Sequence, residues 1–314
     1  MNFHLKICKK DIPELQSKIN MIMKTRTINR RTFIEKVIVA TGSLTLISAN
    51  KSSPWQLGAY TRPWAQHDYR VAFDSIAEAG FNFVGLMSDK SGTIITIKTT
   101  PDRAALIAEE AKSRGLSIVS LHGGNFDAGR SVDEGIKGLM SLIDSSAICK
   151  CPNLLLLGAE APEVVDNYYK VVAECCDYAV SKGVIMSVKP HGPLNNTGRE
   201  CRPLIERIGH KNFKLWYDPG NIYYYSDGRI DPVNDAGDVD GLVCGMSIKD
   251  FLMPKNVDVT PGTGMVDFKG VMDRLKKGGF RKGPLIVECL SKGDLPFINS
   301  EALKARVFLE KLIL

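Results

Sequence analysis

Charged side chains stand inside or directly after short apolar runs in the second half of the chain. Glu288 interrupts the run Leu285-Ile-Val-Glu-Cys-Leu290, and Lys189 follows Ile185-Met-Ser-Val188. An unpaired carboxylate or ammonium group in such surroundings costs several kcal/mol. We therefore expect Lys189 and Glu288 to belong to one buried cluster, where each charge shifts the pKa of the other. Such a cluster is either a catalytic site or a set of salt bridges that closes the fold.

Other polar side chains also follow apolar runs, and their types suit proton transfer and sugar binding. His122 and His191 can carry a proton near neutral pH, because the ordinary pKa of histidine is about 6.5. Any one of these residues alone is weak support for a site, so the argument depends on the whole set. The further candidates are Tyr60, Arg62, Asp89, Glu160, Asp218, Asn221, Lys249 and Asp250.

The elements that must position these residues are eight short apolar runs, separated by longer segments with helical periodicity. The runs start 25 to 43 residues apart, a spacing typical of strand–helix–strand units. Several are apolar without alternation, as expected for strands covered on both faces. The predicted strands are Gln56–Tyr60, Phe81–Met87, Leu116–Leu121, Asn153–Leu157, Val184–Val188, Phe213–Tyr217, Leu242–Ile248 and Leu285–Leu290.

The order of these elements predicts an α/β fold, a single (β/α)8 TIM barrel over residues 54–314. Gly80, Gly115, Gly183 and Gly279 each follow a helical stretch, where a left-handed residue ends a helix. A doubly wound open sheet is the alternative, but no Gly-x-Gly-x-x-Gly follows an early strand to mark a dinucleotide site. In a barrel, active sites lie at the carboxyl ends of the strands, so the candidates would converge at one mouth.

Four motifs resemble the sugar phosphate isomerase/epimerase superfamily, the xylose isomerase-like TIM barrels. They are Leu-Trp-Tyr-Asp218-Pro-Gly-Asn221, Ser-Ile-Lys249-Asp250, Pro261-Gly-Thr-Gly264-Met-Val-Asp-Phe268 and Gly283-Pro-Leu-Ile-Val-Glu288. The resemblance implies one divalent metal (Mn, Mg or Co), held by a Glu, an Asp, a His and a Glu that follow strands five to eight. It further implies proton transfer next to a sugar carbonyl.

Only half of the implied ligand set is present. Asp218 and Glu288 match, whereas Lys189 and Ser247 take the positions of the other two ligands. Either Lys189 replaces the metal and polarises the carbonyl, or a metal remains on Asp218, Glu288 and a substitute such as His191 or His122. We expect Lys189, Glu288, His191 and His122 to be catalytic. Tyr60, Arg62, Glu160, Asn221 and Lys249 are the expected substrate-binding residues.

The expected activity is isomerisation, epimerisation or keto-glycoside elimination of a sugar or glycoside. The alternative is a non-catalytic carbohydrate-binding barrel that has lost the metal site. An endonuclease with three zinc ions fits poorly, because the chain beyond residue 49 has few histidines and no net charge. Two features stay open. The Pro261–Gly264 loop is either a phosphate cradle or a plain turn, and Tyr223–Tyr225 is either a stacking platform for sugar or loop packing.

The positive charge of the chain is concentrated in residues 1–49, which predict a leader. They hold nine of the 41 Lys and Arg residues but three of the 35 acidic residues, so the remainder is neutral and suits no nucleic acid. Arg30-Arg31 and the apolar run from Val37 to Ala49 resemble a twin-arginine signal, which predicts export to the periplasm without a membrane anchor. The alternative is an N-terminal helix of a cytoplasmic protein. The seven later cysteines lack disulfide spacing and are expected to be buried thiols.

Overall fold

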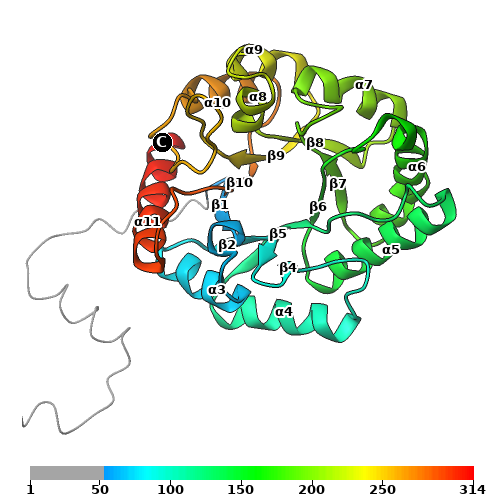
Figure 1. The fold of residues 1–314 in the computed structure, drawn as a ribbon, viewed down its shortest axis with the longest axis horizontal. Helices are drawn as coiled ribbons and strands as arrows, with labels where there is room; N and C mark the ends of the chain where they lie inside the picture. The colour runs from blue at the N-terminus through cyan, green and yellow to red at the C-terminus, as the bar shows by residue number, and fades with distance from the viewer. Residues whose placement is uncertain (1–52) are drawn as a thin grey trace, which may run out of the picture. The chain divides into compact units, whose positions relative to one another are not determined.

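The computed structural model describes residues 53–314, and the predicted leader lies outside them. Eight parallel strands close into a barrel in the order β1-β10-β9-β8-β7-β6-β5-β2, which confirms the predicted (β/α)8 architecture (Figure 1). The barrel strands are β1 (Trp55–Tyr60), β2 (Phe83–Leu86), β5 (Ser117–His122), β6 (Asn153–Leu156), β7 (Ile185–Val188), β8 (Phe213–Tyr217), β9 (Val243–Ile248) and β10 (Gly283–Val287). The short strands β3 (Ser88–Asp89) and β4 (Gly92–Thr93) pair antiparallel beside it.

Helices surround the barrel and cover the outer face of its strands (Figure 1). The α-helices are α3 (Tyr69–Glu78), α4 (Pro101–Ser113), α5 (Val132–Ile148), α6 (Val165–Ser181), α7 (Gly198–Ile208), α8 (Pro219–Tyr225), α9 (Pro232–Asp235), α10 (Phe268–Lys277) and α11 (Leu295–Leu312). The 3-10 helices are η1 (Arg62–Trp64), η2 (Pro162–Val164) and η3 (Ala236–Val239). Among residues 53–314, no helix is both long and apolar enough to span a membrane.

Short polar side chains and glycines fix where these helices begin and end. Thr100 and Ser131 accept hydrogen bonds from backbone N–H groups in the first turns of α4 and α5, which otherwise lack partners. The four predicted helix-ending glycines all have positive φ, between 70° and 101°. The local signals in the sequence therefore set these boundaries as expected.

Strand β10 ends three residues earlier than the apolar run predicts. Val287 is its last residue, and Glu288, Cys289 and Leu290 continue as buried loop. The predicted strand Phe81–Met87 is likewise shortened, to Phe83–Leu86. Apolar side chains at the barrel mouth are buried whether or not their backbone is paired, so burial alone does not mark a strand's end. Glu288 is therefore the first residue after its strand, at the end of the barrel where active sites lie.

Large aromatic side chains fill the barrel interior beneath the mouth. The rings of Tyr60 and Trp216 lie 6.4 Å apart between centroids, in a cluster with Met87, Leu155 and Ile286 among others. These rings fit because glycines face them: a Cβ on Gly85 would lie 2.2 Å from the Tyr60 ring, and one on Gly245 2.3 Å from the Trp216 ring. Close approach of this kind requires glycine. The packed aromatic layer forms the floor of the mouth.

The cysteines of the described residues are unpaired, in agreement with the sequence. Seven free thiols occur between residues 53 and 314, and all but the half-buried Cys244 are buried. Five of them pack as small apolar side chains among the core residues: Cys149, Cys151, Cys175, Cys176 and Cys201.

Candidate active site

Two lysines and two carboxylates form a buried cluster at the carboxyl ends of β7, β8, β9 and β10. Lys189 Nζ lies 2.9 Å from Asp218 Oδ2 and 2.9 Å from Glu288 Oε2. Lys249 Nζ lies 2.5 Å from Glu288 Oε1 and 3.6 Å from Asp218 Oδ2. All four residues are at most 5% exposed. The predicted pairing of Lys189 with Glu288 is confirmed, and Lys249 provides a second ammonium group.

The segment from Asp218 to Asn221 contacts both lysines of this cluster. Asp218 caps helix α8, since its Oδ1 accepts a hydrogen bond from the backbone N–H of Asn221, while its Oδ2 faces Lys189. Gly220 makes room for Lys249, because a Cβ there would lie 2.6 Å from Lys249 Cγ. The Asn221 side chain then accepts a hydrogen bond from Lys249 Nζ at 2.9 Å. Asp218, Gly220 and Asn221 thus each make or permit a contact of the cluster.

Ser247 connects the cluster to the aromatic floor. Its hydroxyl donates to Glu288 Oε2 at 2.7 Å and accepts from Trp216 Nε1 at 3.1 Å. Both oxygens of Glu288 therefore accept hydrogen bonds from fixed donors. This chain of contacts holds the carboxylate in one orientation.

The charges within the cluster outweigh the effect of burial on Glu288 and Lys249. Burial opposes ionisation of Glu288, but the charges of Lys189, Lys249 and Arg62 outweigh it and hold its pKa well below the ordinary value. Burial likewise opposes the charge of Lys249, but Asp218 and Glu288 outweigh it and raise the pKa of Lys249. The Lys249 ammonium group therefore remains protonated near neutral pH and presents positive charge toward the mouth.

The donor set does not fit the divalent metal that the resemblance implies. Ammonium nitrogen carries no lone pair, and Lys189 stands between the two carboxylates where a metal would have to bind. Within residues 53–314, no group of three or more His, Cys, Asp or Glu side chains could hold a metal ion. His122 and His191, the expected substitute ligands, form no such group with Asp218 and Glu288. Lys189 and Lys249 supply at this position the positive charge that a metal would supply.

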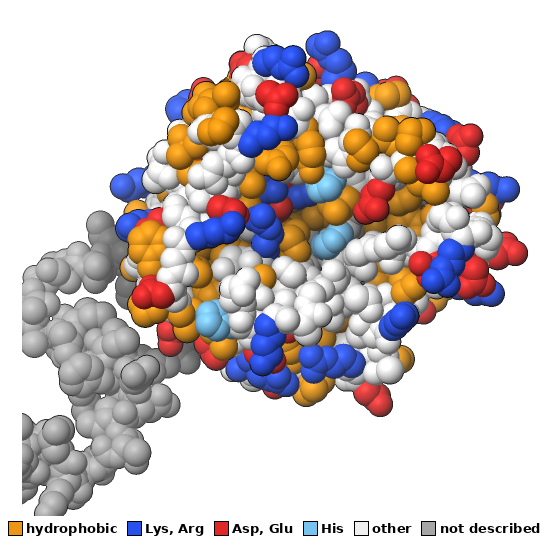
Figure 2. Space-filling view, viewed as in Figure 1, with side chains coloured by type: hydrophobic (Ala, Val, Ile, Leu, Met, Phe, Trp, Pro, Cys, Tyr) orange, Lys and Arg blue, Asp and Glu red, His pale blue; other side chains and the backbone are white. Residues whose placement is uncertain are grey.

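A cavity of about 470 Å³ opens over the cluster. Lys189, Lys249 and Glu288 lie in its lining, with His122 and His191 and the predicted binding residues Arg62 and Asn221. Figure 2 shows this hollow at the middle of one face of the molecule, with histidine and charged side chains around it. Asp218 is fully buried and lies behind Lys189 rather than on the surface of the cavity.

The two histidines of the cavity are both neutral near pH 7. Burial, with the positive charge of Lys189, lowers the pKa of His122 to about 4 and also lowers that of His191. The Nδ1 atoms face carbonyl oxygens, that of Leu155 at 3.5 Å from His122 and that of Gly192 at 2.9 Å from His191. A carbonyl oxygen can only accept, so Nδ1 carries the proton in each ring and Nε2 keeps a free lone pair. Each ring can therefore accept a proton at Nε2.

Tyr225 holds the His191 ring from the side. The two ring centroids lie 5.2 Å apart, and a Cβ on Gly192 would lie 2.5 Å from the Tyr225 ring. Tyr224 and Tyr225 both line the cavity, whereas Tyr223 stacks on Phe251 away from it. Tyr224 and Tyr225 therefore lie where a stacking platform for sugar would be, whereas Tyr223 serves loop packing.

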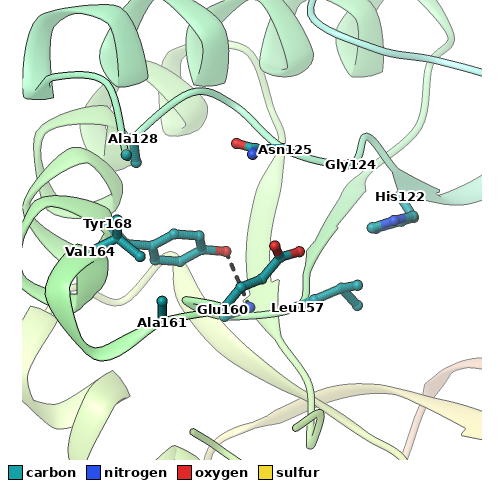
Figure 3. A pocket seen from close by; sticks show the side chains of 11 residues that line it. His122, Gly124, Asn125, Ala128, Leu157, Glu160, Ala161, Val164 and Tyr168 are labelled. Atoms are coloured by element: carbon teal, nitrogen blue, oxygen red, sulfur yellow. Dashed lines mark hydrogen bonds between the residues drawn. The ribbon is translucent and has the colours of Figure 1, made fainter. Parts of the chain in front are cut away.

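Two of the predicted substrate-binding residues lie elsewhere. The expectation that Tyr60 binds substrate is wrong, because its side chain is fully buried in the barrel interior. Strand β1 turns it inward below the mouth, where its hydroxyl lies 2.7 Å from Ser120 Oγ. Glu160 lines a neighbouring cavity of about 280 Å³, which shares His122 and Leu157 with the larger one (Figure 3). Sequence reasoning did not identify Lys255, Asn256 and Asp258, which line the larger cavity from the loop between β9 and α10. No strand end or motif marks that loop.

The glycine-rich loop is a turn held by a carboxylate. The backbone N–H groups of Gly262 and Gly264 donate to Asp250 Oδ2 at 2.9 and 2.8 Å, and that of Val266 donates to Oδ1 at 3.1 Å. Donors that would cradle a phosphate are already engaged. The contacts favour the plain turn of the two alternatives.

Comparison with known proteins gives one family and several structural relatives. The model of the xylose isomerase-like TIM barrel family matches residues 73–311. A probable L-ribulose-5-phosphate 3-epimerase of Mycoplasma pneumoniae is 28% identical over 130 residues, which are 41% of this chain and 40% of that protein. The chain thus spans about two fifths of the length of the curated relative it matches.

Solved structures of sugar epimerases share the fold. A D-psicose 3-epimerase of Clostridium cellulolyticum H10, crystallised with D-tagatose, superposes with a TM-score of 0.67 at 14% identity, over 82% of this chain and 99% of that one. A xylose isomerase domain protein of Planctomyces limnophilus has a TM-score of 0.63 at 17% identity, over 82% and 97% of the two chains. Similarity at this level of identity supports the fold rather than a shared reaction. Since the family model covers most of the barrel, the chain belongs to the xylose isomerase-like TIM barrels of the sugar phosphate isomerase/epimerase superfamily.

Proposed function

We propose that the protein moves a proton next to the carbonyl group of a sugar or glycoside. The observation that carries this proposal is the combination in one cavity of two lysines held by carboxylates and two histidines whose pKa is lowered. The lysines supply positive charge for an oxygen that becomes negative, and the histidines supply lone pairs for a proton. The epimerase names among the relatives agree with this class of reaction.

Lys189 and Lys249 would bind the carbonyl oxygen and stabilise the enolate that forms when the neighbouring carbon loses its proton. Fixed donors aimed at a developing negative charge are worth about 10²–10³ in rate in other enzymes. The two carboxylates hold the ammonium groups in place, so little reorganisation is needed during the reaction. This role assigns to the lysines the polarisation of the carbonyl.

His122 and His191 are the proton carriers in this scheme. Nε2 of one ring takes the proton from the carbon next to the carbonyl, and the C–H electron pair forms the enolate. The first ring, now an imidazolium, returns the proton to the former carbonyl carbon while the hydroxyl proton passes to the enolate oxygen, which gives isomerisation. Epimerisation requires a proton on the opposite face of the first carbon; water beside the other ring supplies it, and the proton on the first ring then neutralises the hydroxide. In a keto-glycoside, the enolate instead expels the glycosidic oxygen, which leaves with the C–O electron pair and takes the proton. Glu288 is a poorer carrier than we expected, because its oxygens are engaged and its pKa is lowered.

Solvent exchange tests the proposal directly. The purified protein, in ²H₂O with EDTA, is incubated with D-fructose or D-psicose, and ¹H NMR follows loss of the proton next to the carbonyl. We expect exchange without added metal, and a fall of about 10²-fold or more in His122→Asn and His191→Asn. His67→Asn, at a histidine outside the cavity lining, is the matched control and should keep the wild-type rate. Equal rates in all three variants would contradict the assignment of the histidines.

A carbohydrate-binding barrel without turnover is the second candidate. It is favoured by the way the lysines and carboxylates already satisfy one another within the cluster. Calorimetric binding of sugars without proton exchange in any of them would select this function.

A further inference from the structure

The smaller cavity is a separate compartment that the proposed proton transfer does not use. It has a volume of about 280 Å³, close to the lower limit of ~300 Å³ for small-molecule sites in general. His122 and Leu157 line both cavities, so the two compartments meet at these side chains. Figure 3 shows His122 and Leu157 at one end and Ala128, Val164 and Tyr168 at the other.

We propose that this compartment binds a hydroxylated second ring, so that the substrate is a glycoside rather than a free monosaccharide. This inference rests on the proposed function, because it places the reacting sugar over Lys189 and Lys249. The bond between the two rings would then pass between His122 and Leu157. The second ring is either another sugar or a phenol, since both present hydroxyl groups on a flat or gently puckered body.

The walls of the compartment suit such a ring. The side chains of Ala128 and Ala161 are too small to fill the space, Gly129 has none, and Val164 and Leu157 add apolar surface. Tyr168 forms a fixed back wall: its hydroxyl accepts a hydrogen bond from the Gly158 backbone N–H at 3.2 Å, and its ring lies 4.7 Å from that of Phe126 between centroids. Apolar walls with a few polar groups are typical of sites that bind a ring.

One exposed carboxylate lines this compartment without a partner among residues 53–314. Glu160 points its carboxylate into the space between the two ends in Figure 3, and no hydrogen bond or salt bridge engages it within residues 53–314. A carboxylate can accept hydrogen bonds from two neighbouring hydroxyl groups at once. Asn125 lines the same compartment and adds an amide with both donors and an acceptor. Glu160 therefore gives the compartment a preference for hydroxyl groups over a purely apolar substituent.

Binding measurements without turnover test the inference. Isothermal titration calorimetry compares D-glucose with cellobiose, whose second ring is a sugar, and with 4-hydroxyphenyl β-D-glucopyranoside, whose second ring is a phenol. We expect one of the two-ring probes to bind at least tenfold more tightly than D-glucose, and its identity gives the kind of second ring. In Ala161→Leu, which fills the compartment, and in Glu160→Gln, which removes the charge, this gain should shrink to within about twofold. Ala105→Leu, on helix α4 away from both cavities, is the matched control and should keep it.

Three results would overturn the inference: equal affinity for one and two rings, no binding of either two-ring probe, or a gain that persists in both variants. These outcomes are separate from failure of the proposed function. Proton exchange on D-fructose with no gain from a second ring would reject the compartment and keep the reaction. Tighter binding of a two-ring probe without proton exchange on any sugar would keep the compartment and reject the reaction.

Discussion

Lys189 lies at the centre of the buried charged cluster. It follows β7, makes close contacts with Asp218 and Glu288, and is 2% exposed. A buried ammonium between two carboxylates is stable because each charge compensates the others, and removal of one partner from such a cluster typically costs ~3–5 kcal/mol. The same arrangement leaves no lone pair for a metal at this point. Lys189 and Ser247 both stand where the resemblance implies a metal ligand, so together they remove two of the four implied ligands.

Restoring those two ligands should restore metal binding. The double variant Lys189→Glu/Ser247→His would place three carboxylates and one imidazole around the present position of Lys189 Nζ, a donor set that suits Mn²⁺. We expect calorimetry to detect Mn²⁺ binding in the double variant and none in the wild type. Lys255→Glu, an exposed lysine in the lining of the same cavity, controls for the added negative charge. Tight Mn²⁺ binding by the wild type would contradict the replacement of metal by lysine.

His122 should make the stability of the protein depend on pH in the acid range. Its pKa is about 4 in the folded protein and about 6.5 in the unfolded chain. Between these values the unfolded chain binds a proton that the folded protein does not, so the free energy of unfolding falls as the pH falls from 6.5 to 4. The loss due to this group is at most about 3 kcal/mol.

Urea unfolding at pH 7 and pH 4.5 measures this contribution. His122→Asn should lose less stability than the wild type between the two pH values, because it has no imidazole to protonate. An identical loss in both proteins would show that His122 is not held neutral by its surroundings. The same property predicts that proton transfer persists to about pH 5, below the range of an ordinary histidine.

Helix α8 illustrates how a short element serves the site. Pro219 starts it, Asp218 caps it, and Asn221 reaches Lys249 from its first turn. A glycine inside a helix ordinarily destabilises it by ~0.5–1 kcal/mol relative to alanine. Glycine fits this position despite that cost because Lys249 packs directly over it.

Gly220→Ala should therefore destabilise the protein, opposite to the usual effect of this change. The new Cβ would lie 2.6 Å from both Lys249 Cγ and the Lys249 carbonyl oxygen, and overpacking of this kind costs ~1–3 kcal/mol. Gly237→Ala, whose Cβ would first meet the Arg274 side chain at 3.3 Å, is the matched control with little expected effect. The midpoint of urea unfolding measures both. A Gly220→Ala protein as stable as the wild type would mean that Lys249 is not fixed as described.

At the scale of the whole molecule, the barrel brings side chains from its strand ends to one mouth, and the chain beyond residue 49 carries no net charge. The described residues carry seven unpaired thiols, which agrees with folding before export. We propose that the basic residues 1–49 direct the protein to the periplasm through Arg30-Arg31. Export would also suit the proposed substrate, because a periplasmic enzyme would meet free glycosides.

Export is tested with the full chain produced in a bacterium that has the twin-arginine pathway. We expect the wild type in the periplasmic fraction and Arg30→Lys/Arg31→Lys in the cytoplasm, with Lys9→Arg/Lys10→Arg as a control that keeps the charge but lies outside the motif. Immunoblots of the two fractions give the distribution. Equal amounts of the wild type and the Arg30→Lys/Arg31→Lys protein in the periplasm would contradict the role of the arginine pair.

The sequence by itself determined the barrel and the identity of the charged cluster. Apolar runs of strand length, separated by helical segments that end in glycine, have few other solutions, and a carboxylate or ammonium at the end of such a run must find a partner. Lys189, Asp218 and Glu288 could be predicted for that reason, and His122 and His191 because they follow apolar runs and can carry a proton. The tertiary structure decided that Lys249 joins the cluster, that Tyr60 lies in the interior, and that Glu160 faces a second compartment. These outcomes depend on the tilt and register of neighbouring strands, because tilt and register set whether a side chain points into the core or into the mouth. One example is the shift in register between Leu215 and Trp216 in the pairing of β8 with β9. Local sequence patterns cannot predict that register, because it is fixed by packing between strands far apart in the chain.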